Sequence, residues 1–107
     1  MTTFDKREQG FEKQFAIEEE LKFKADARRN KLLGLWVADQ LGLSGDAATS
    51  YAREVVAADF EAPGDRGVAR KVTADLAAKG IAIQETLLRT KMGELMAQAI
   101  AQVKAGT

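Results

Sequence analysis

The chain has 107 residues, of which 46% are hydrophobic and 30% charged, proportions typical of a single soluble globular domain. Its 16 basic and 16 acidic residues give a net charge of zero. This balance argues against nucleic acid as the main partner and against a membrane surface held by basic charge. The chain contains neither cysteine nor histidine, which excludes disulfides and removes the commonest general base and metal ligand.

The N-terminal residues contain no apolar segment of the kind that a signal peptide needs. No apolar run approaches the length of about 20 residues that a transmembrane helix requires. The absence of cysteine also fits a reducing compartment. We therefore expect a cytoplasmic protein that does not insert directly into a membrane.

Residues 1–17 carry an aromatic pattern with little internal support. Phe4, Phe11 and Phe15 are spaced by seven and then four residues, which places them on one stripe of a helix. Gly10 and the like-charged pair Glu8 and Glu12 weaken that helix, and isolated helices below about 12–15 residues are marginal in water. We expect a flexible, helix-competent arm that folds when a partner covers the stripe. The alternative is that the stripe folds back onto the protein's own core.

Residues 18–41 are expected to form a stable helix that anchors this arm. Glu18–Lys22 and Glu20–Lys24 are acid-first pairs four residues apart, the favourable orientation on a helix. We expect Trp36, the single tryptophan, at the centre of the core, and Gly42 just beyond the end of the helix. The expected apolar face comprises Leu21, Ala25, Leu32, Leu33, Trp36, Val37 and Leu41.

A second helix is predicted to begin after Ser44, a favourable N-cap, and to reach about Glu61 with Phe60 on its apolar face. Pro63 and Gly64 then break the chain.

A third helix is predicted between the cap Asp65 and the terminator Gly80. Residues 81–83 are apolar but have no partner strand, so we expect a packed loop. The last helix is predicted from about Glu85 to Val103, with Ile100 on its apolar face. The predicted fold is therefore all-α, with a four-helix bundle over residues 18–107 and short connections between the helices.

Three groups of charged residues could carry chemistry. Residues 18–20 and the set Asp59, Glu61 and Asp65 cluster carboxylates, but a solvated helix face and helix capping explain them, so no metal site is predicted. Arg28, Arg29 and Lys31 form the densest basic patch and could contact an anion. The favoured interpretation is a solvated face whose stems pack on apolar surface. No constellation forms a catalytic site, and no cofactor is expected.

Two sequence blocks carry a family resemblance. FDKRE at residues 4–8 is followed by ARRNKLLGLW at residues 27–36, and together they resemble the ATPase inhibitor zeta subunit family of alphaproteobacteria. The resemblance runs almost from end to end. The chain departs from the pattern at Arg66-Gly67, where acidic residues are expected, and at Gln84, where a capping serine is usual. Both departures lie away from the arm.

This resemblance implies an all-α, four-helix protein inhibitor and not an enzyme. It implies binding to the catalytic head of the rotary ATP synthase, and hence a place peripheral to the inner membrane, with a monomer expected when the protein is not bound. In that family the N-terminal segment is inhibitory. The resemblance therefore implies partner-binding roles for Phe4, Asp5, Lys6, Arg7, Glu8, Phe11 and Phe15.

The corresponding hypothesis is that the arm enters a groove between catalytic subunits as a helix. Two alternatives remain open at this stage. The chain could be a helical adaptor whose arm binds a different protein, or a bundle that binds a nucleotide or another small ligand through Arg28, Arg29 and Lys31.

Overall fold

A computed structural model describes the backbone of residues 2–61 and 64–106, and the side chains within these ranges from residue 19 onward. It contains four α-helices: α1 (Thr2–Gln40), α2 (Gly45–Ala58), α3 (Arg66–Ala78) and α4 (Glu85–Lys104). No strand occurs in the described ranges, and residues 81–83 form a loop. The prediction of an all-α, four-helix fold is confirmed.

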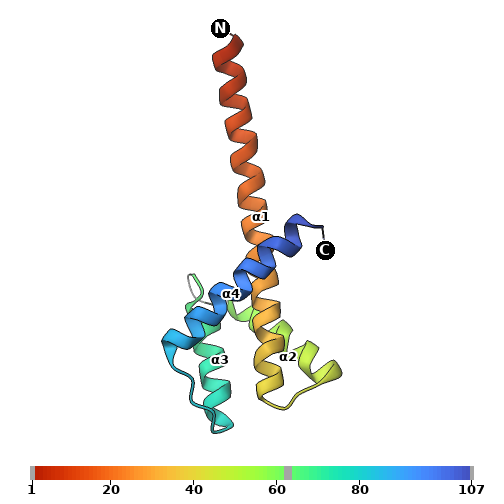
Figure 1. Ribbon diagram of the computed structural model, residues 1–107, viewed down its shortest axis with the longest axis vertical. Coiled ribbons are helices and arrows are strands. Elements are labelled where there is room, and N and C mark those ends of the chain that lie inside the picture. The colour runs from red at the N-terminus through yellow and green to blue at the C-terminus, as the bar shows by residue number, and fades with distance from the viewer. Residues whose placement is uncertain (1, 62–63, 107) are drawn as a thin grey trace.

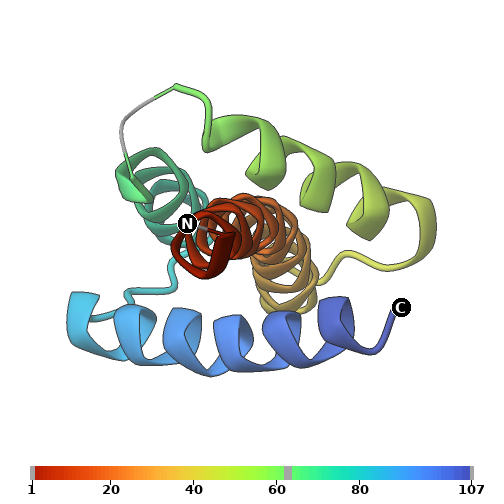
Figure 2. The ribbon, with the colours of Figure 1, turned by 90° about the horizontal axis from the view of Figure 1, so that it is seen from above.

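Helix α1 is the central element. Seen along its axis, it runs between α4 on one side and α2 with α3 on the other (Figure 2). Its N-terminal half continues beyond the bundle as an unbroken helix (Figure 1), which makes the molecule 65 Å long but only 26 by 22 Å across. The division into an arm of residues 1–17 and a domain of residues 18–107 stays a prediction, as does the flexibility of the arm.

Glycines end two of the helices as predicted. Gly42 has a φ of 79°, and its N–H donates to the carbonyl of Asp39 at 3.1 Å while the N–H of Leu43 donates to that of Ala38 at 2.8 Å. Gly80, also with a φ of 79°, closes α3 with the same pattern of bonds. A residue with a Cβ adopts this left-handed conformation only at a cost, so glycine at each position specifies where the chain turns.

The core is apolar and involves all four helices. Its fully buried large side chains include Leu33 and Val37 of α1, Val55 of α2, Leu76 of α3 and Leu88 of α4. The prediction that Trp36 is the centre of the core is wrong. Trp36 is half-buried at the edge, with Lys91 Nζ 5.3 Å from its ring centre. The completely buried apolar positions of α1 are instead Leu33, Val37 and Ala38.

The predicted extent of the second helix is also wrong. Helix α2 ends at Ala58, and the following N–H groups of residues 59–61 donate to carbonyls three residues back. This tighter turn changes the helical register and rotates Phe60 outward, where it is 77% exposed. Ile100, predicted on the apolar face of α4, is 41% exposed. Within the residues that the structure describes, none of the four helices is long and apolar enough to cross a membrane.

Candidate functional site

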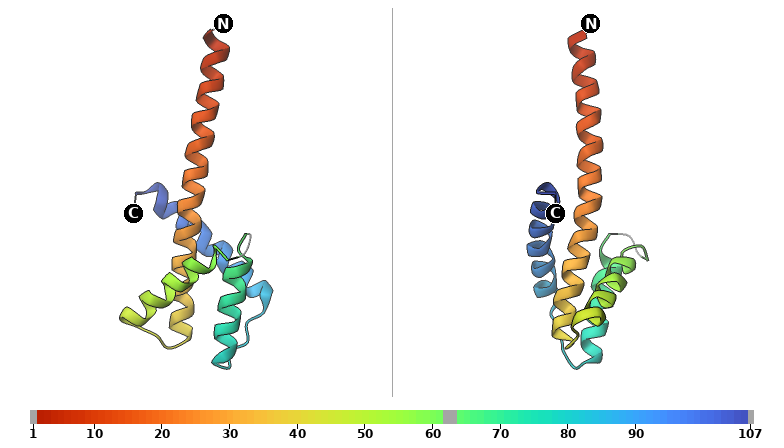
Figure 3. Two further views of the ribbon diagram at one scale, coloured as in Figure 1. Left: turned by 180° about the vertical axis from the view of Figure 1, so that it is seen from behind. Right: turned by 90° about the vertical axis from the view of Figure 1, so that its right-hand side faces the viewer.

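The residues predicted to bind a partner lie on the part of α1 that extends beyond the bundle (Figures 1 and 3). Residues 2–17 rise about 1.5 Å each along the helix, a reach of roughly 24 Å. No other helix accompanies this segment in any view. The side chains of Phe4, Asp5, Lys6, Arg7, Glu8, Phe11 and Phe15 lie outside the described residues, so their roles stay predictions.

Burial along α1 begins where the helix enters the bundle. The predicted pair Glu20–Lys24 is present at 3.2 Å, but both side chains are more than half exposed, so its contribution is small. The pair Glu18–Lys22 involves a side chain outside the described part. Phe23 is 66% exposed, and Ala25 is the first described side chain that is buried. The sequence boundary near Glu18 thus precedes enclosure by about two turns.

Close packing fixes α1 against α2. A Cβ added at Gly34 would lie 2.6 Å from the Cα of Ala52 and 3.3 Å from the Cβ of Val55. Glycine therefore allows the two helix backbones to approach more closely than any other residue would. This contact sets how closely the enclosed half of α1 packs against α2. Because α1 is one continuous helix, that packing also sets the direction of its other half.

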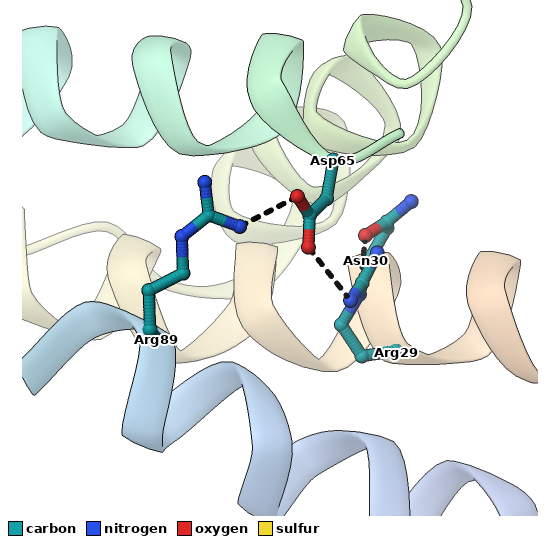
Figure 4. Close-up of polar contacts among 4 residues, drawn as sticks. All are labelled: Arg29, Asn30, Asp65 and Arg89. Atoms are coloured by element: carbon teal, nitrogen blue, oxygen red, sulfur yellow. Dashed lines mark hydrogen bonds and ion pairs between the residues drawn. The ribbon is translucent and has the colours of Figure 1, made fainter. Parts of the chain in front are cut away.

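A polar node joins α1, α3 and α4 (Figure 4). Asp65, just before α3, accepts a hydrogen bond from Arg89 Nη1 of α4 at 2.5 Å, and its second oxygen lies 3.7 Å from Arg29 Nη1 of α1. Asp65 occupies the predicted N-cap position, but its side chain makes no capping bond because the two arginines engage its carboxylate. The node links three helices that are far apart in sequence.

The two aspartates near Arg29 have opposite electrostatic environments. The hydrogen bond from Arg89 lowers the pKa of Asp65, and both arginines add attraction, although burial opposes it. Burial instead raises the pKa of Asp59. Attraction to Arg29 opposes this shift, and repulsion from Asp26 and Asp65 adds to it. The surroundings of Asp65 therefore favour its ionised carboxylate, whereas the surroundings of Asp59 disfavour the ionised form.

Asn30 is the fully buried polar residue beside this node. Its Oδ1 accepts a hydrogen bond from Arg29 Nε at 2.7 Å, while its Nδ2 has no hydrogen-bond partner within the described part of the chain. Sequence reasoning missed this network. Asn30 lies three residues before Leu33 on the enclosed face of α1, which is a signal that could have flagged it, whereas nothing local marks Arg89 as a partner of Asp65.

The structure does not bring the predicted basic patch together as one anion site. Arg29 is only 7% exposed and faces Asp65, so a solvated position is wrong for this residue. Arg28 Nη1 donates to Gln102 Oε1 of α4 at 2.9 Å. Arg28 and Lys31 line a cavity of about 570 Å³, while Arg29 lines a different one. An anion contact at Arg28 and Lys31 stays a prediction.

Within the described ranges, no group of three or more acidic side chains is placed to hold a metal ion. A third cavity, of about 380 Å³, lies between α1 and the C-terminal half of α4. Its wall is almost entirely apolar, with charged residues only at the rim. We call it the α1–α4 groove, and it is lined by Leu21, Lys22, Ala25, Asp26, Met96, Ile100, Val103 and Lys104.

Comparisons with known proteins identify a family and a solved structure that are similar to this chain. A family model described as ATPase inhibitor subunit zeta matches residues 1–102, which include both the projecting half of α1 and the bundle. A solved solution NMR structure with 53% sequence identity superposes with a TM-score of 0.71, covering 81% of this chain and 99% of that chain. No curated protein matches the chain.

Proposed function

Because this chain belongs to the ATPase inhibitor subunit zeta family, a family of regulatory proteins and not of enzymes, we propose that it inhibits ATP hydrolysis by the rotary ATP synthase. Its N-terminal arm inserts as a helix between catalytic subunits of the head. The observation that carries this mechanism is that α1 continues from the enclosed bundle into residues 2–17 without a break, and that these residues stand clear of the other helices (Figure 3).

The aromatic stripe supplies the affinity in this proposal. Burying three phenylalanine side chains contributes about 1.5–3 kcal/mol each, and ordering the arm offsets part of that gain. The charged residues Asp5, Lys6, Arg7 and Glu8 select the partner and speed the encounter more than they hold the complex together. Removing aromatic side chains should therefore weaken binding more than altering these charges.

The bundle supplies the anchor. The close contact at Gly34 and the node around Asp65 hold the enclosed half of α1 against α2, α3 and α4. A helix seated between catalytic subunits then acts as a wedge that opposes the conformational change of turnover. The bundle stays outside the groove and prevents the arm from sliding through it.

The direct test measures ATP hydrolysis by the cognate catalytic head with the full chain and with a form that begins at Glu18. We expect the full chain to inhibit and the shortened form to be inactive. A full chain that leaves the rate unchanged would refute the inhibitor function. A shortened form that inhibits equally well would refute the arm mechanism alone.

A double substitution isolates the stripe from the rest of the arm. Phe11→Ala with Phe15→Ala should raise the concentration needed for half-inhibition at least about 100-fold, because each lost aromatic contact is worth more than 1.4 kcal/mol. Lys6→Ala with Arg7→Ala is the matched control, for which a smaller, salt-dependent loss is expected. Equal losses for both doubles would contradict an aromatic anchor.

Two further parts of the proposal concern the state of the protein. We propose that it is a monomer when unbound and that it reaches the inner membrane only through the synthase. The small-ligand alternative is supported by one observation, the cavity beside Arg28 and Lys31. Titration of the full chain with ATP, compared with Lys31→Ala, would test that alternative separately from inhibition.

A further inference from the structure

The α1–α4 groove is lined by residues 21–26 of α1 and residues 96–104 of α4. The C-terminal part of α4 crosses α1 near the point where α1 leaves the bundle (Figure 1). Its described side chains are apolar over most of the wall, and Ile100 at its edge is 41% exposed. Met96, Val103 and Leu21 are half-buried around it. An apolar cavity that is open on one side has the shape and chemistry to receive an apolar side chain from another molecule.

The helical register of α1 connects this groove to the aromatic stripe. Ala25, in the wall of the groove, follows Phe11 by 14 residues and Phe4 by 21, while Lys22, at its rim, follows Phe15 by seven. Multiples of seven residues return to nearly the same side of a helix. Because α1 is one helix from Thr2 to Gln40, the side of α1 that carries the stripe leads directly into the groove.

We propose that the α1–α4 groove is a second contact for the catalytic head and receives an apolar side chain from the surface that holds the arm. This inference rests on the proposed inhibitory function and extends it from the arm to the bundle. About ten residues separate Phe15 from Ala25, a distance of about 15 Å along the helix. A partner surface that follows the stripe for that distance reaches the groove without any bend in α1.

The groove also accounts for a feature of α4 that the fold does not require. Ile100 contributes little to the core at 41% exposure, whereas its neighbour on the same helix Ala99 is completely buried. The rim residues Lys22, Asp26 and Lys104 carry charges of both signs, so the rim shows no strong preference for one sign of charge. Apolar contact is therefore the chemistry that the groove offers, and Met96 can adjust its shape to the incoming side chain.

The test compares two aliphatic residues of α4. Ile100→Gln changes the groove, and Leu87→Gln, at a residue that is 59% exposed and outside the groove, is the matched control. In the ATP hydrolysis assay, Ile100→Gln should raise the concentration for half-inhibition about tenfold, as expected for a moderately important interface contact. Leu87→Gln and the conservative variant Ile100→Met should stay within about twofold of the wild type.

The same assay separates failure of this inference from failure of the proposed function. Wild-type protein that does not inhibit would refute the function. Wild-type protein that inhibits, with a Phe11 and Phe15 double variant that does not, and with Ile100→Gln equal to Leu87→Gln, would overturn the groove contact alone. Thermal unfolding of each variant checks that differences do not arise from loss of fold.

A second readout decides the question even if Ile100→Gln unfolds. The chain has no cysteine, so Ile100→Cys or Leu87→Cys provides a unique site for a polarity-sensitive dye. Adding the catalytic head should shift the emission of the dye at position 100 to shorter wavelength and leave that at position 87 unchanged. No shift at position 100, or an equal shift at both positions, would overturn the proposal.

Discussion

Residues 25–40 of α1 are enclosed by three other helices, whereas residues 2–17 of the same helix extend beyond them (Figure 1). In the enclosed half, the helix is stabilised by buried Leu33 and Val37, by the close approach at Gly34 and by the node at Arg29. No other helix runs alongside the projecting half (Figure 3), and Gly10 lowers its helix propensity. Packing therefore specifies the enclosed half of α1, and in our proposal a partner stabilises the projecting half.

The largest expected effect concerns the enclosed half. Leu33→Ala removes a completely buried side chain and should lower the free energy of unfolding by about 2–5 kcal/mol, because a cavity remains that the packed helices fill only partly. Chemical denaturation would measure the loss. Inhibition at a temperature well below the unfolding midpoint should be retained, since the arm is untouched. A stability change below about 1 kcal/mol would show that α1 is not the centre of the core.

Gly34→Ala should have the next largest effect. The new Cβ would meet the Ala52 backbone at 2.6 Å, so the two helices must separate, and we expect a net loss of about 1–2 kcal/mol after the gain in helix propensity. Gly93→Ala in α4 is the matched control, because nothing lies within 4 Å of its added Cβ. That control should stabilise the protein by up to about 1 kcal/mol. Two changes of the same sign would contradict the close approach.

Asp65→Asn tests the node and should cost about 1 kcal/mol at pH 7, a modest value because the carboxylate is one-third exposed and water screens it. The pKa of Asp65 is lowered in the folded protein, so its stabilising contribution is present above the ordinary value of 3.8 and is lost as the pH falls through the lower, folded value. Unfolding curves of the wild type and the variant should therefore converge in strong acid. A difference that is independent of pH would contradict an ionic role.

Asp59→Asn should act in the opposite direction and more weakly. The pKa of Asp59 is raised in the folded protein. Its contribution to the free energy of unfolding is therefore stabilising below pH 3.8 and is lost as the pH rises through the folded value. The variant should thus be more stable than the wild type at pH 7, by about 0.5 kcal/mol or less, and equal to it at low pH. Destabilisation at pH 7 would show that attraction to Arg29 outweighs burial.

The smallest effect on stability is expected in the projecting half. Replacing Phe11 and Phe15 by alanine should change the free energy of unfolding by less than about 0.5 kcal/mol, because no other helix covers this segment. Inhibition should fall sharply in the same variant. A large loss of stability would instead support the alternative in which the stripe folds back onto the bundle.

Local signals were sufficient for most of the fold. Glycines at positions 42 and 80 marked helix ends because the left-handed conformation is a property of one residue. Periodic apolar residues marked the helices because their spacing reflects the helix itself. Trp36 and Phe60 were misplaced for a common reason. Size and hydrophobicity favour burial, but the arrangement of neighbouring helices decides which large side chain is enclosed.

In the candidate site, too, some features follow from local sequence and others only from the packing of helices. The aromatic stripe could be predicted because three positions on one helix share one side, and the family resemblance supplied the partner. The role of Arg29 could not be predicted from the basic cluster at residues 28–31. Its carboxylate partner, Asp65, reaches it only after the chain has turned twice. The α1–α4 groove likewise requires side chains from both ends of the chain.

By itself, the sequence determined the helical class and the helix ends at Gly42 and Gly80, because each depends on residues within one or two turns of each other. Only the tertiary structure decided that α1 is central, that Gly34 admits Ala52, and that Asp65 joins Arg29 to Arg89. These features depend on which helix surfaces meet, and a linear pattern does not encode that choice in any single segment. The direction of the arm follows from that packing.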